Sequence, residues 1–178
     1  MRGWMLAALL AVPSALRAQP ALDELKGRGG PAHFGVVRDG LYRGGQPTAH
    51  HLQLLRELGV ETVIDLRHGN TDKEAAEAER LGMRFVRFPF YGIFGADSAF
   101  LARIVEAIRG GGRVYVHCRV GRDRTSLVIA LYRVLVDGWD PVTAWRREAI
   151  DYGYARGLWY GNIVLSYDAA VLALGGRR

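Results

Sequence analysis

The stretch that decides the fold is RVYVHCRVGRDRTSLVIALYRVLV, residues 113–136. Its first five residues are mostly β-branched or aromatic and predict a strand, whereas residues 125–136 are apolar nearly all round and predict a buried helix. Between them lies a short polar loop that begins with Cys118, the one cysteine of the chain. Open α/β sheets bind their ligands where a strand ends and a helix begins. The loop is therefore the first candidate for a functional site.

Helices and strands alternate along the rest of the chain. The dipeptide Asp39-Gly40 suits a hairpin turn between two short strands. The sequence then predicts helices over 49–59, 71–82 and 98–109, strands over 60–66, 83–90 and 113–117, the buried helix over 125–136, and further helices from Asp140 and over 157–174. This order predicts an α/β fold with a small central sheet flanked by helices, in which the Cys118 loop connects a strand to a buried helix.

Several polar residues outside the central stretch are expected to hold local structure. Thr71 and Glu74 have the spacing of a capping box at the start of the helix that follows them. Asp65 lies near the end of a predicted strand, and Arg43 in LYRGGQP is expected to brace a loop through an ion pair. None of these residues is expected to react.

The first 18 residues have the composition of a signal peptide. An early Arg2 precedes an apolar run from Trp4 to Val12, and a candidate cleavage point follows Ala18. The apolar run is too short to span a bilayer, for which about 20 residues are needed. We expect an exported protein, periplasmic or secreted, with a signal peptide over 1–18, a linker over 19–32 and one folded domain over 33–176.

Composition and charge argue against several classes of protein. The 178 residues are 49% hydrophobic and 24% charged, as in ordinary globular domains. The formal net charge is +6 and falls by two without residues 1–18, and the basic residues are scattered, which does not favour a nucleic-acid partner. A single cysteine cannot form an intramolecular disulfide. We expect a monomer that is stabilised by packing.

The polar loop has the composition of an anion site. Five residues separate Cys118 from Arg124, and backbone N–H groups in such a loop point inward ahead of the helix. Arg124 adds a planar fork that matches two phosphate oxygens, and Gly121 permits the tight backbone turn. The predicted phosphate-binding residues are Arg119, Val120, Gly121, Arg122, Asp123 and Arg124.

The same surroundings predict that Cys118 is a nucleophile. A helix N-terminus and nearby arginines both favour thiolate over thiol. Thr125 is placed to donate a hydrogen bond to the sulfur, and His117 is expected to orient the loop through its ring nitrogens rather than to act as a base. A buried cysteine without a chemical role would leave the surrounding arginines without a partner.

The segment HCRVGRDRT, residues 117–125, resembles the signature HC-x5-R-S/T of the protein tyrosine phosphatase superfamily. LYRGGQP, VIDLR and ALYRVLVDGWDPVTAW extend the resemblance to bacterial dual-specificity-like phosphatases over residues 36–153. The resemblance implies a phosphatase domain over 33–176, in which Cys118 forms a phosphocysteine and Arg124 stabilises charge on phosphate, without a metal or other cofactor. Ser126 departs from the pattern, because many relatives have glycine there.

The general acid has two candidates. Most family members carry an aspartate on a separate upstream loop, and Asp97 fits that description, although it lies closer to Cys118 than is usual and also suits a helix N-cap. Asp123 resembles the loop aspartate in the Cys-x4-Asp-Arg pattern of myotubularin-type lipid phosphatases. We favour Asp123 and keep Asp97 as the alternative. An ion pair with Arg119 or Arg122 would be a purely structural role for Asp123.

The substrate class stays open at this point. The resemblance implies a phosphorylated protein carrying phosphotyrosine, or both phosphotyrosine and phosphoserine. Three arginines in one loop also suit a small polyanionic phosphate ester, such as an inositol polyphosphate or a phosphoinositide. Two further alternatives are a rhodanese-like sulfurtransferase, whose loop is shorter, and a pseudophosphatase, which has no need for both Cys118 and Arg124. The five histidines show no ligand spacing with carboxylates, so no metal site is expected.

Overall fold

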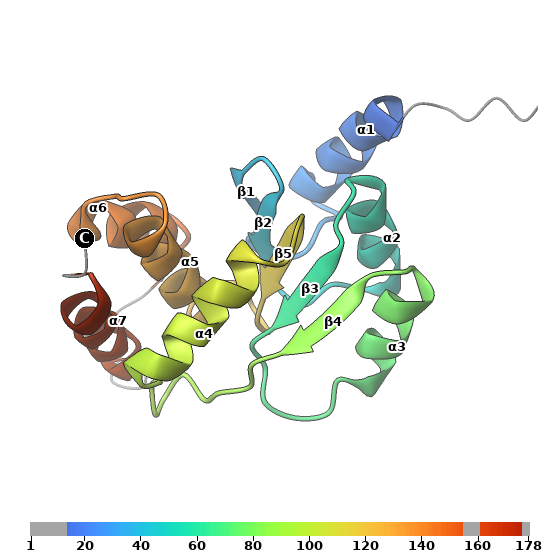
Figure 1. The fold of residues 1–178 in the computed structure, drawn as a ribbon. Coiled ribbons are helices and arrows are strands. Elements are labelled where there is room, and N and C mark those ends of the chain that lie inside the picture. Colours follow the sequence, from blue (N-terminus) through green and yellow to red (C-terminus); the bar gives the residue numbers. More distant parts are fainter. Residues whose placement is uncertain (1–13, 155–160, 176–178) are drawn as a thin grey trace, which may run out of the picture.

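The strand that precedes Cys118 lies at the centre of a five-stranded sheet. In the computed structural model, which describes residues 14–154 and 161–175, the strand order is β1-β2-β5-β3-β4 (Figure 1). The strands are β1 (Gly35–Arg38), β2 (Leu41–Gly44), β3 (Thr62–Asp65), β4 (Arg84–Arg87) and β5 (Val114–His117). Only β1 runs antiparallel to its neighbour, so the other four strands end at the same edge of the sheet. Cys118 leaves the sheet at this edge.

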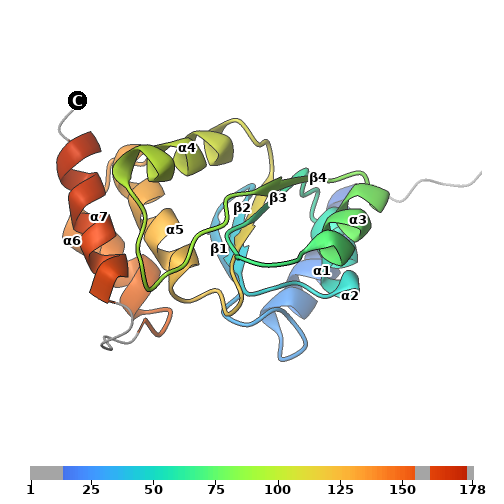
Figure 2. The same ribbon diagram turned by 90° about the horizontal axis from the view of Figure 1, so that it is seen from below.

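Helices cover both faces of the sheet (Figure 2). One face carries α1 (Ser14–Lys26), α2 (Ala49–Glu57) and α3 (Asp72–Arg80), and the other carries α4 (Ser98–Arg109), α5 (Arg124–Leu135), α6 (Pro141–Trp145) and α7 (Gly161–Leu174). A single turn of π-helix, η1 (Arg146–Ile150), continues α6. Of the helices in the described residues, none is both long and apolar enough to cross a membrane.

Strand β5 contributes to two separate hydrophobic cores because its side chains alternate between the faces. Val114 and Val116 belong to the core under α4–α7, whereas Tyr115 belongs to the core under α1–α3. All three side chains are fully buried. His117 continues the Tyr115 side, and its ring stacks on the Tyr115 ring with centroids 5.5 Å apart. The residue before Cys118 is thus fixed within the core.

The structure confirms the predicted fold class and, from the first hairpin onward, the order of the predicted elements. The hairpin turns at Asp39-Gly40, where Gly40 has a φ of +76°. Helix α5 is buried along almost its whole length, as its apolar sequence indicates. The structure differs after α6, where η1 follows without any signal in the sequence. Residues 157–160 of the predicted last helix lie outside the described residues.

The prediction of a linker over 19–32 is wrong for its first part. Helix α1 extends to Lys26 and packs on α2. Ala21 and Leu25 are each only 1% exposed, because they complete the core under this face of the sheet. The predicted cleavage point after Ala18 falls within α1. Residues 1–13, which carry the predicted apolar run, lie outside the described residues.

Candidate active site

The loop between β5 and α5 holds the Cys118 sulfur in a fixed position. Cys118 is 2% exposed and lies at the carboxyl end of the central strand. The backbone N–H of Gly121 donates a hydrogen bond to Sγ, with the two atoms 3.2 Å apart. A donor aimed at sulfur stabilises the thiolate form more than the thiol.

Gly121 is required in this loop for two reasons. Its φ of +83° lies in the region that favours glycine. A Cβ at this position would also lie 2.3 Å from the carbonyl carbon of Gly44, which is backbone and cannot move aside. The loop therefore packs directly on the end of β2, and the N–H of Gln46 donates to the carbonyl of Arg119 at 3.1 Å. The tight backbone turn predicted at Gly121 is therefore present.

A cavity of about 790 Å³ opens above the sulfur. Its size is that of sites for small molecules. Five of its lining residues come from the loop: Cys118, Arg119, Val120, Asp123 and Arg124. The others come from three neighbouring segments: Gln46, Arg67, His68, Asn70, Thr71, Tyr91, Gly92 and Ile93. Each of these segments follows a parallel strand, as expected for the ligand edge of an α/β sheet.

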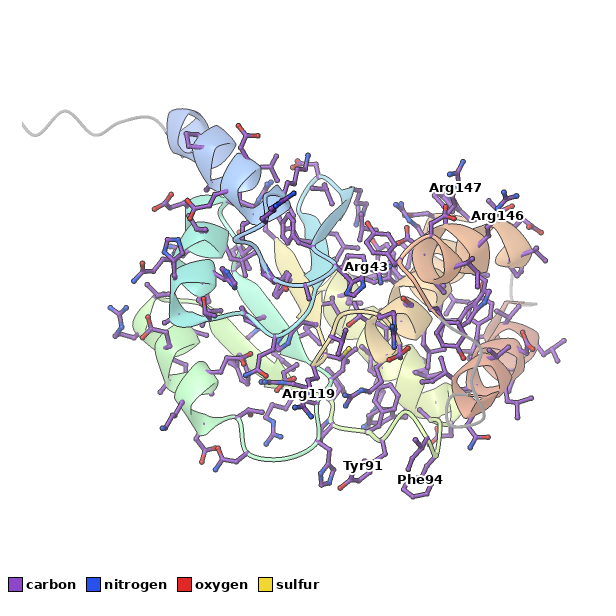
Figure 3. All side chains as sticks on the ribbon, turned by 180° about the vertical axis from the view of Figure 1, so that it is seen from behind. Arg43, Tyr91, Phe94, Arg119, Arg146 and Arg147 are labelled. Carbon is purple, nitrogen blue, oxygen red and sulfur yellow. The ribbon has the colours of Figure 1, made fainter. Side chains whose placement is uncertain are left out.

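The rim of this cavity carries exposed aromatic side chains. Tyr91 and Phe94 project from the loop between β4 and α4, close to each other at the lower edge of the molecule in Figure 3. Their rings contact edge to face with centroids 5.8 Å apart, and the His68 ring stacks on Tyr91 at 4.1 Å. Phe94 is 76% exposed and is not among the residues that line the cavity. The cavity thus combines arginine side chains with the aromatic rings of Tyr91 and His68.

Arg124 lies in the cavity and is tied to two of its walls. Its Nη1 donates to the carbonyls of Leu66 at 3.0 Å and Phe90 at 3.1 Å. Both contacts use one nitrogen, so the Nε–Nη2 edge of the fork is not engaged by them. Arg119 also lines the cavity, but Arg122 does not, and Nε of Arg122 instead lies 3.4 Å from Oδ1 of Asp123. Of the three loop arginines that were predicted to bind phosphate, two therefore line this cavity.

Arg43 holds the loop from behind and is fully buried. Its Nη2 donates to the carbonyl of Gly121 at 3.0 Å and to Oγ of Ser126 at 2.8 Å. Its Nη1 donates to Glu148, to the backbone carbonyl at 2.5 Å and to Oε2 at 3.1 Å. The guanidinium also stacks on the Tyr152 ring at 3.7 Å. The predicted loop-bracing ion pair is confirmed, and the serine that departs from the family pattern is one of its contacts.

Burial lowers the pKa of Arg43 below its ordinary value, and the charge of Glu148 opposes this shift. Glu148 itself is shared, because its Oε1 also accepts from Nε of Arg133 at 2.8 Å. The loop is thus anchored to η1 through a paired buried charge. Sequence reasoning did not identify Glu148, since a lone glutamate in a helix carries no signal of burial.

The two candidate acids have different surroundings. Asp123 lines the cavity, and its side chain is 13% exposed and makes no capping hydrogen bond to α5. Asp97 is the N-cap of α4, where its Oδ1 accepts from the N–H of Phe100 at 2.8 Å. Asp97 is not among the residues that line the cavity. The geometry therefore brings Asp123, but not Asp97, together with Cys118.

Of the contacts predicted for His117 and Thr125, only that of His117 is present. Nδ1 of His117 lies 3.2 Å from the carbonyl oxygen of Cys118, so the predicted orienting contact is present. The predicted hydrogen bond from Thr125 to sulfur is not formed, because Thr125 Oγ1 is buried without a hydrogen-bond partner. The backbone N–H of Gly121 serves the sulfur instead.

A buried ionic cluster lies behind the loop, and the sequence did not predict it. Arg67 donates to both carboxylate oxygens of Asp65, at 2.8 and 3.0 Å, and to Oε2 of Glu74 at 2.6 Å. Oε1 of Glu74 lies 2.9 Å from Nε2 of His117. The predicted capping box is wrong, since Thr71 makes no side-chain cap and Glu74 points to the cluster. The capping spacing concealed the role of Glu74.

Asp65, Glu74 and His117 offer possible metal-ligand atoms within 4.8 Å of one another. The Arg67 guanidinium, however, already bonds to both carboxylates. A metal ion would have to displace this buried cation, so the residues do not fit a metal centre.

A family model and curated relatives that match this sequence are all phosphatases. Residues 37–153 match the family model described as "DSP-PTPase phosphatase fused to NAD+ Kinase". The chain is 33% identical over 106 residues to the dual specificity protein phosphatase TpbA of Pseudomonas aeruginosa, covering 58% of this chain and 47% of TpbA. It is 31% identical over 111 residues to dual specificity protein phosphatase 26 of Bos taurus, covering 58% and 52%. The chain thus spans about half the length of these curated relatives.

Solved structures have similar folds. The crystal structure of P. aeruginosa TpbA aligns with a TM-score of 0.70 and 24% identity, covering 81% of this chain and 89% of that one. A second TpbA structure is a complex with phosphotyrosine. The catalytic domain of the PP-IP phosphatase SIW14 of S. cerevisiae, in complex with citrate, aligns with a TM-score of 0.65 and 21% identity, covering 83% and 93%. At these identities the likeness concerns the fold.

Proposed function

The chain belongs to the DSP-PTPase phosphatase family, and from this premise we propose that it hydrolyses phosphate monoesters through a phosphocysteine intermediate, without a metal. One observation carries the proposal: a buried cysteine sulfur lies at a cavity that is also lined by Arg124 and Asp123. These groups supply a nucleophile, a fork for phosphate oxygens and a proton donor. A metal would add charge stabilisation that Arg124 and the loop amides already provide.

In the first step, the Cys118 thiolate attacks phosphorus. The S–P bond forms as the P–O bond to the leaving group breaks, and Asp123 gives its proton to the leaving oxygen. Arg124 and the backbone N–H groups of the loop hold the three remaining phosphate oxygens, on which charge builds up. The alcohol or phenol then departs.

In the second step, water attacks the phosphocysteine. Asp123, now a carboxylate, accepts the proton of the water as the new P–O bond forms and the S–P bond breaks. Inorganic phosphate leaves, and Cys118 returns to the thiolate. The hydrogen bond from the Gly121 N–H to sulfur stabilises the leaving thiolate in this step.

The proposed substrate is a phosphorylated protein, with phosphotyrosine as the preferred residue. The apolar rim of Tyr91, His68 and Ile93 supports this choice, because a flat aryl ring packs well on aromatic side chains. The relative TpbA is named a dual specificity phosphatase and has been crystallised with phosphotyrosine.

A second candidate substrate is an inositol polyphosphate or a phosphoinositide. Arg119 lines the cavity in addition to Arg124, whereas the charge of Arg67, which also lines it, is already balanced by Asp65 and Glu74. A substrate with several phosphate groups would use the extra cation of Arg119. The structural neighbour SIW14 is a PP-IP phosphatase.

The test compares hydrolysis of a phosphotyrosine peptide, a phosphoserine peptide and inositol hexakisphosphate by the full chain, with and without EDTA. We expect release of phosphate from the phosphotyrosine peptide in EDTA, inhibition by vanadate, and no turnover by Cys118→Ser, which still binds vanadate. Loss of activity on chelation, or activity in Cys118→Ser, would reject the mechanism. Preference for inositol hexakisphosphate would select the second substrate class.

We also propose that the chain is exported, with cleavage after Ala18. Ala21 and Leu25, which pack on α2, would remain in the mature protein. N-terminal sequencing of the protein from periplasm or medium should start at Gln19. Full-length chain recovered only from the cytoplasm would reject export.

A further inference from the structure

Three successive carbonyl groups of the Cys118 loop accept hydrogen bonds from donors outside the loop. The pairs are the Gln46 N–H with the Arg119 carbonyl at 3.1 Å, Nδ1 of His33 with the Val120 carbonyl at 2.9 Å, and Nη2 of Arg43 with the Gly121 carbonyl at 3.0 Å. One of these donors is a backbone N–H and another is a buried guanidinium. The donor from His33 is an exposed side chain, and the proposed mechanism does not use it.

The bond from His33 fixes both ends of one peptide group. A carbonyl oxygen only accepts, so Nδ1 of His33 carries the hydrogen and donates to Val120. Every peptide bond in the described residues is trans, and in a planar trans peptide the carbonyl and the N–H point in opposite directions. The N–H of the Val120–Gly121 peptide is the one that donates to Sγ of Cys118 at 3.2 Å. The His33 ring therefore holds the outer end of the peptide whose inner end contacts the nucleophile.

The backbone at His33 does not explain why a histidine is present. His33 is the third residue of a turn in which the N–H of Phe34 donates to the carbonyl of Pro31 at 3.1 Å. Among the described residues, His33 alone has a positive φ without being glycine, at +53°. Glycine adopts this conformation without steric cost. The side chain and its bond to Val120 are therefore the reason for a histidine here.

The chain on both sides of His33 is anchored. The carbonyl of Ala32 accepts from the N–H of Gly45 at 2.7 Å, at the end of β2. The Phe34 ring packs against the core under α1–α3. A donor that is held on both sides can fix the direction of its acceptor.

We propose that His33 is a positioning residue that holds the Val120–Gly121 peptide with its carbonyl outward and its N–H toward Cys118. The inference deepens the proposed function and rests on it for the role of Cys118. His33 is not among the residues that line the cavity, so it acts through the peptide and does not touch the substrate. Val120 is 39% exposed, so water replaces the donor if the ring is removed, but water does not fix the direction of the carbonyl.

Three substitutions at His33 separate the hydrogen bond from other effects of the ring. Asparagine has an N–H donor on the same Cγ as Nδ1 of histidine, whereas aspartate has an acceptor there, and both tolerate a positive φ. Glycine removes the side chain without straining the backbone. If the bond positions the peptide, His33→Asn behaves like the parent and the other two variants do not. If the ring acts through its charge or its packing, His33→Asn behaves like His33→Gly.

The first measurement is the hydrogen-exchange rate of the Gly121 amide in the full chain, followed by NMR at pH 6. In His33→Gly and His33→Asp the amide should exchange about tenfold faster than in the parent, because one hydrogen bond no longer opposes rotation of the peptide. His33→Asn should exchange at the parent rate. Gly29→Asp is the control for added charge in the same segment, since a Cβ at Gly29 has nothing within 4 Å.

The second measurement is kcat for a fluorinated aryl phosphate, whose good leaving group makes the departure of the Cys118 thiolate the slower step. We expect kcat to fall about tenfold in His33→Gly and His33→Asp and to stay at the parent value in His33→Asn and Gly29→Asp. The urea midpoint of His33→Gly should remain near that of the parent, because glycine favours the positive φ.

The inference is overturned by parent-like exchange or kcat in both His33→Gly and His33→Asp, or by equal losses in His33→Asn and His33→Gly. Hydrogen exchange needs no turnover, so it tests the bond separately from the chemistry. If the parent hydrolysed no phosphate ester, the proposed function would fail, while the exchange rates of the variants would still decide whether His33 positions the peptide.

Discussion

Arg124 and Arg43 place the same guanidinium group on opposite sides of the Cys118 loop, in contrasting surroundings. Arg124 lies in the cavity and contacts the protein through two carbonyls on one nitrogen. Arg43, labelled in Figure 3, is fully buried, and both of its terminal nitrogens bond to the protein. One of these bonds goes to the carbonyl of Gly121. The front of the loop is open to a ligand, whereas the back is closed.

This contrast separates the binding of phosphate by Arg124 from the support of the loop backbone by Arg43. A buried guanidinium whose two terminal nitrogens are bonded to protein cannot bind a substrate, but it can fix the backbone that does. A group that leaves part of its fork open can bind phosphate, and its loss affects folding less. Substitutions at the front should therefore change activity more than stability, and substitutions at the back should do the reverse.

The largest effect is expected at the front, for Arg124→Lys. An ammonium cannot reproduce the two parallel hydrogen bonds of the fork to phosphate, so kcat/KM for a phosphotyrosine peptide should fall about 10³-fold. The free energy of unfolding should change by less than about 1 kcal/mol. Arg56→Lys, at an exposed site of α2, is the matched control for both measurements. A loss of stability as large as the loss of activity would remove the distinction between front and back.

At the back, Arg43→Met should mainly destabilise the protein. It leaves the carbonyl of Gly121 and the hydroxyl of Ser126 without their donor, although Glu148 keeps its contact with Arg133. Urea unfolding should show a loss of about 3 kcal/mol. Arg56→Met is the control. If Arg43→Met unfolded at the parent midpoint but lost turnover as Arg124→Lys does, the assignment of Arg43 to support would be incorrect.

A smaller effect is expected for Asp123→Asn, again at the front. The amide cannot protonate the leaving oxygen, so hydrolysis of phenyl phosphate should slow about 10²-fold, with little change for a fluorinated aryl phosphate that has a better leaving group. Asp97→Asn should leave both rates unchanged, because asparagine caps a helix as well as aspartate does. If Asp97→Asn instead slowed hydrolysis of phenyl phosphate selectively, Asp97 would be the general acid.

Much of the fold follows from local pattern. The strand, loop and buried helix around Cys118 are all present, because a β5 that is buried on both faces and an apolar α5 leave few other arrangements. The misassigned segment is the start of the domain, where Ala21 and Leu25 form part of a helix. Their burial depends on α2, which lies far along the chain, so no local signal predicts it.

The site was predictable in part, and the missed residues are the two buried glutamates that support the loop. The front residues Cys118 and Arg124 follow from the spacing in one loop. Glu74 and Glu148 come from helices that meet the loop only in three dimensions. A glutamate that pairs with a distant buried cation has the same local sequence as one that faces water. Such residues become visible only when the packing is known.

The smallest effect should come from Ser126, the family departure at the back of the loop. Ser126→Ala removes the hydroxyl that accepts from Nη2 of Arg43, so one buried guanidinium N–H loses a partner. We expect a loss of about 1 kcal/mol in urea unfolding, with kcat/KM nearly unchanged. In the Arg43→Met background the same substitution should have almost no effect, because the contact is already absent. An equal loss in both backgrounds would show that Ser126 stabilises α5 independently of Arg43, and the back of the loop would then be two separate supports.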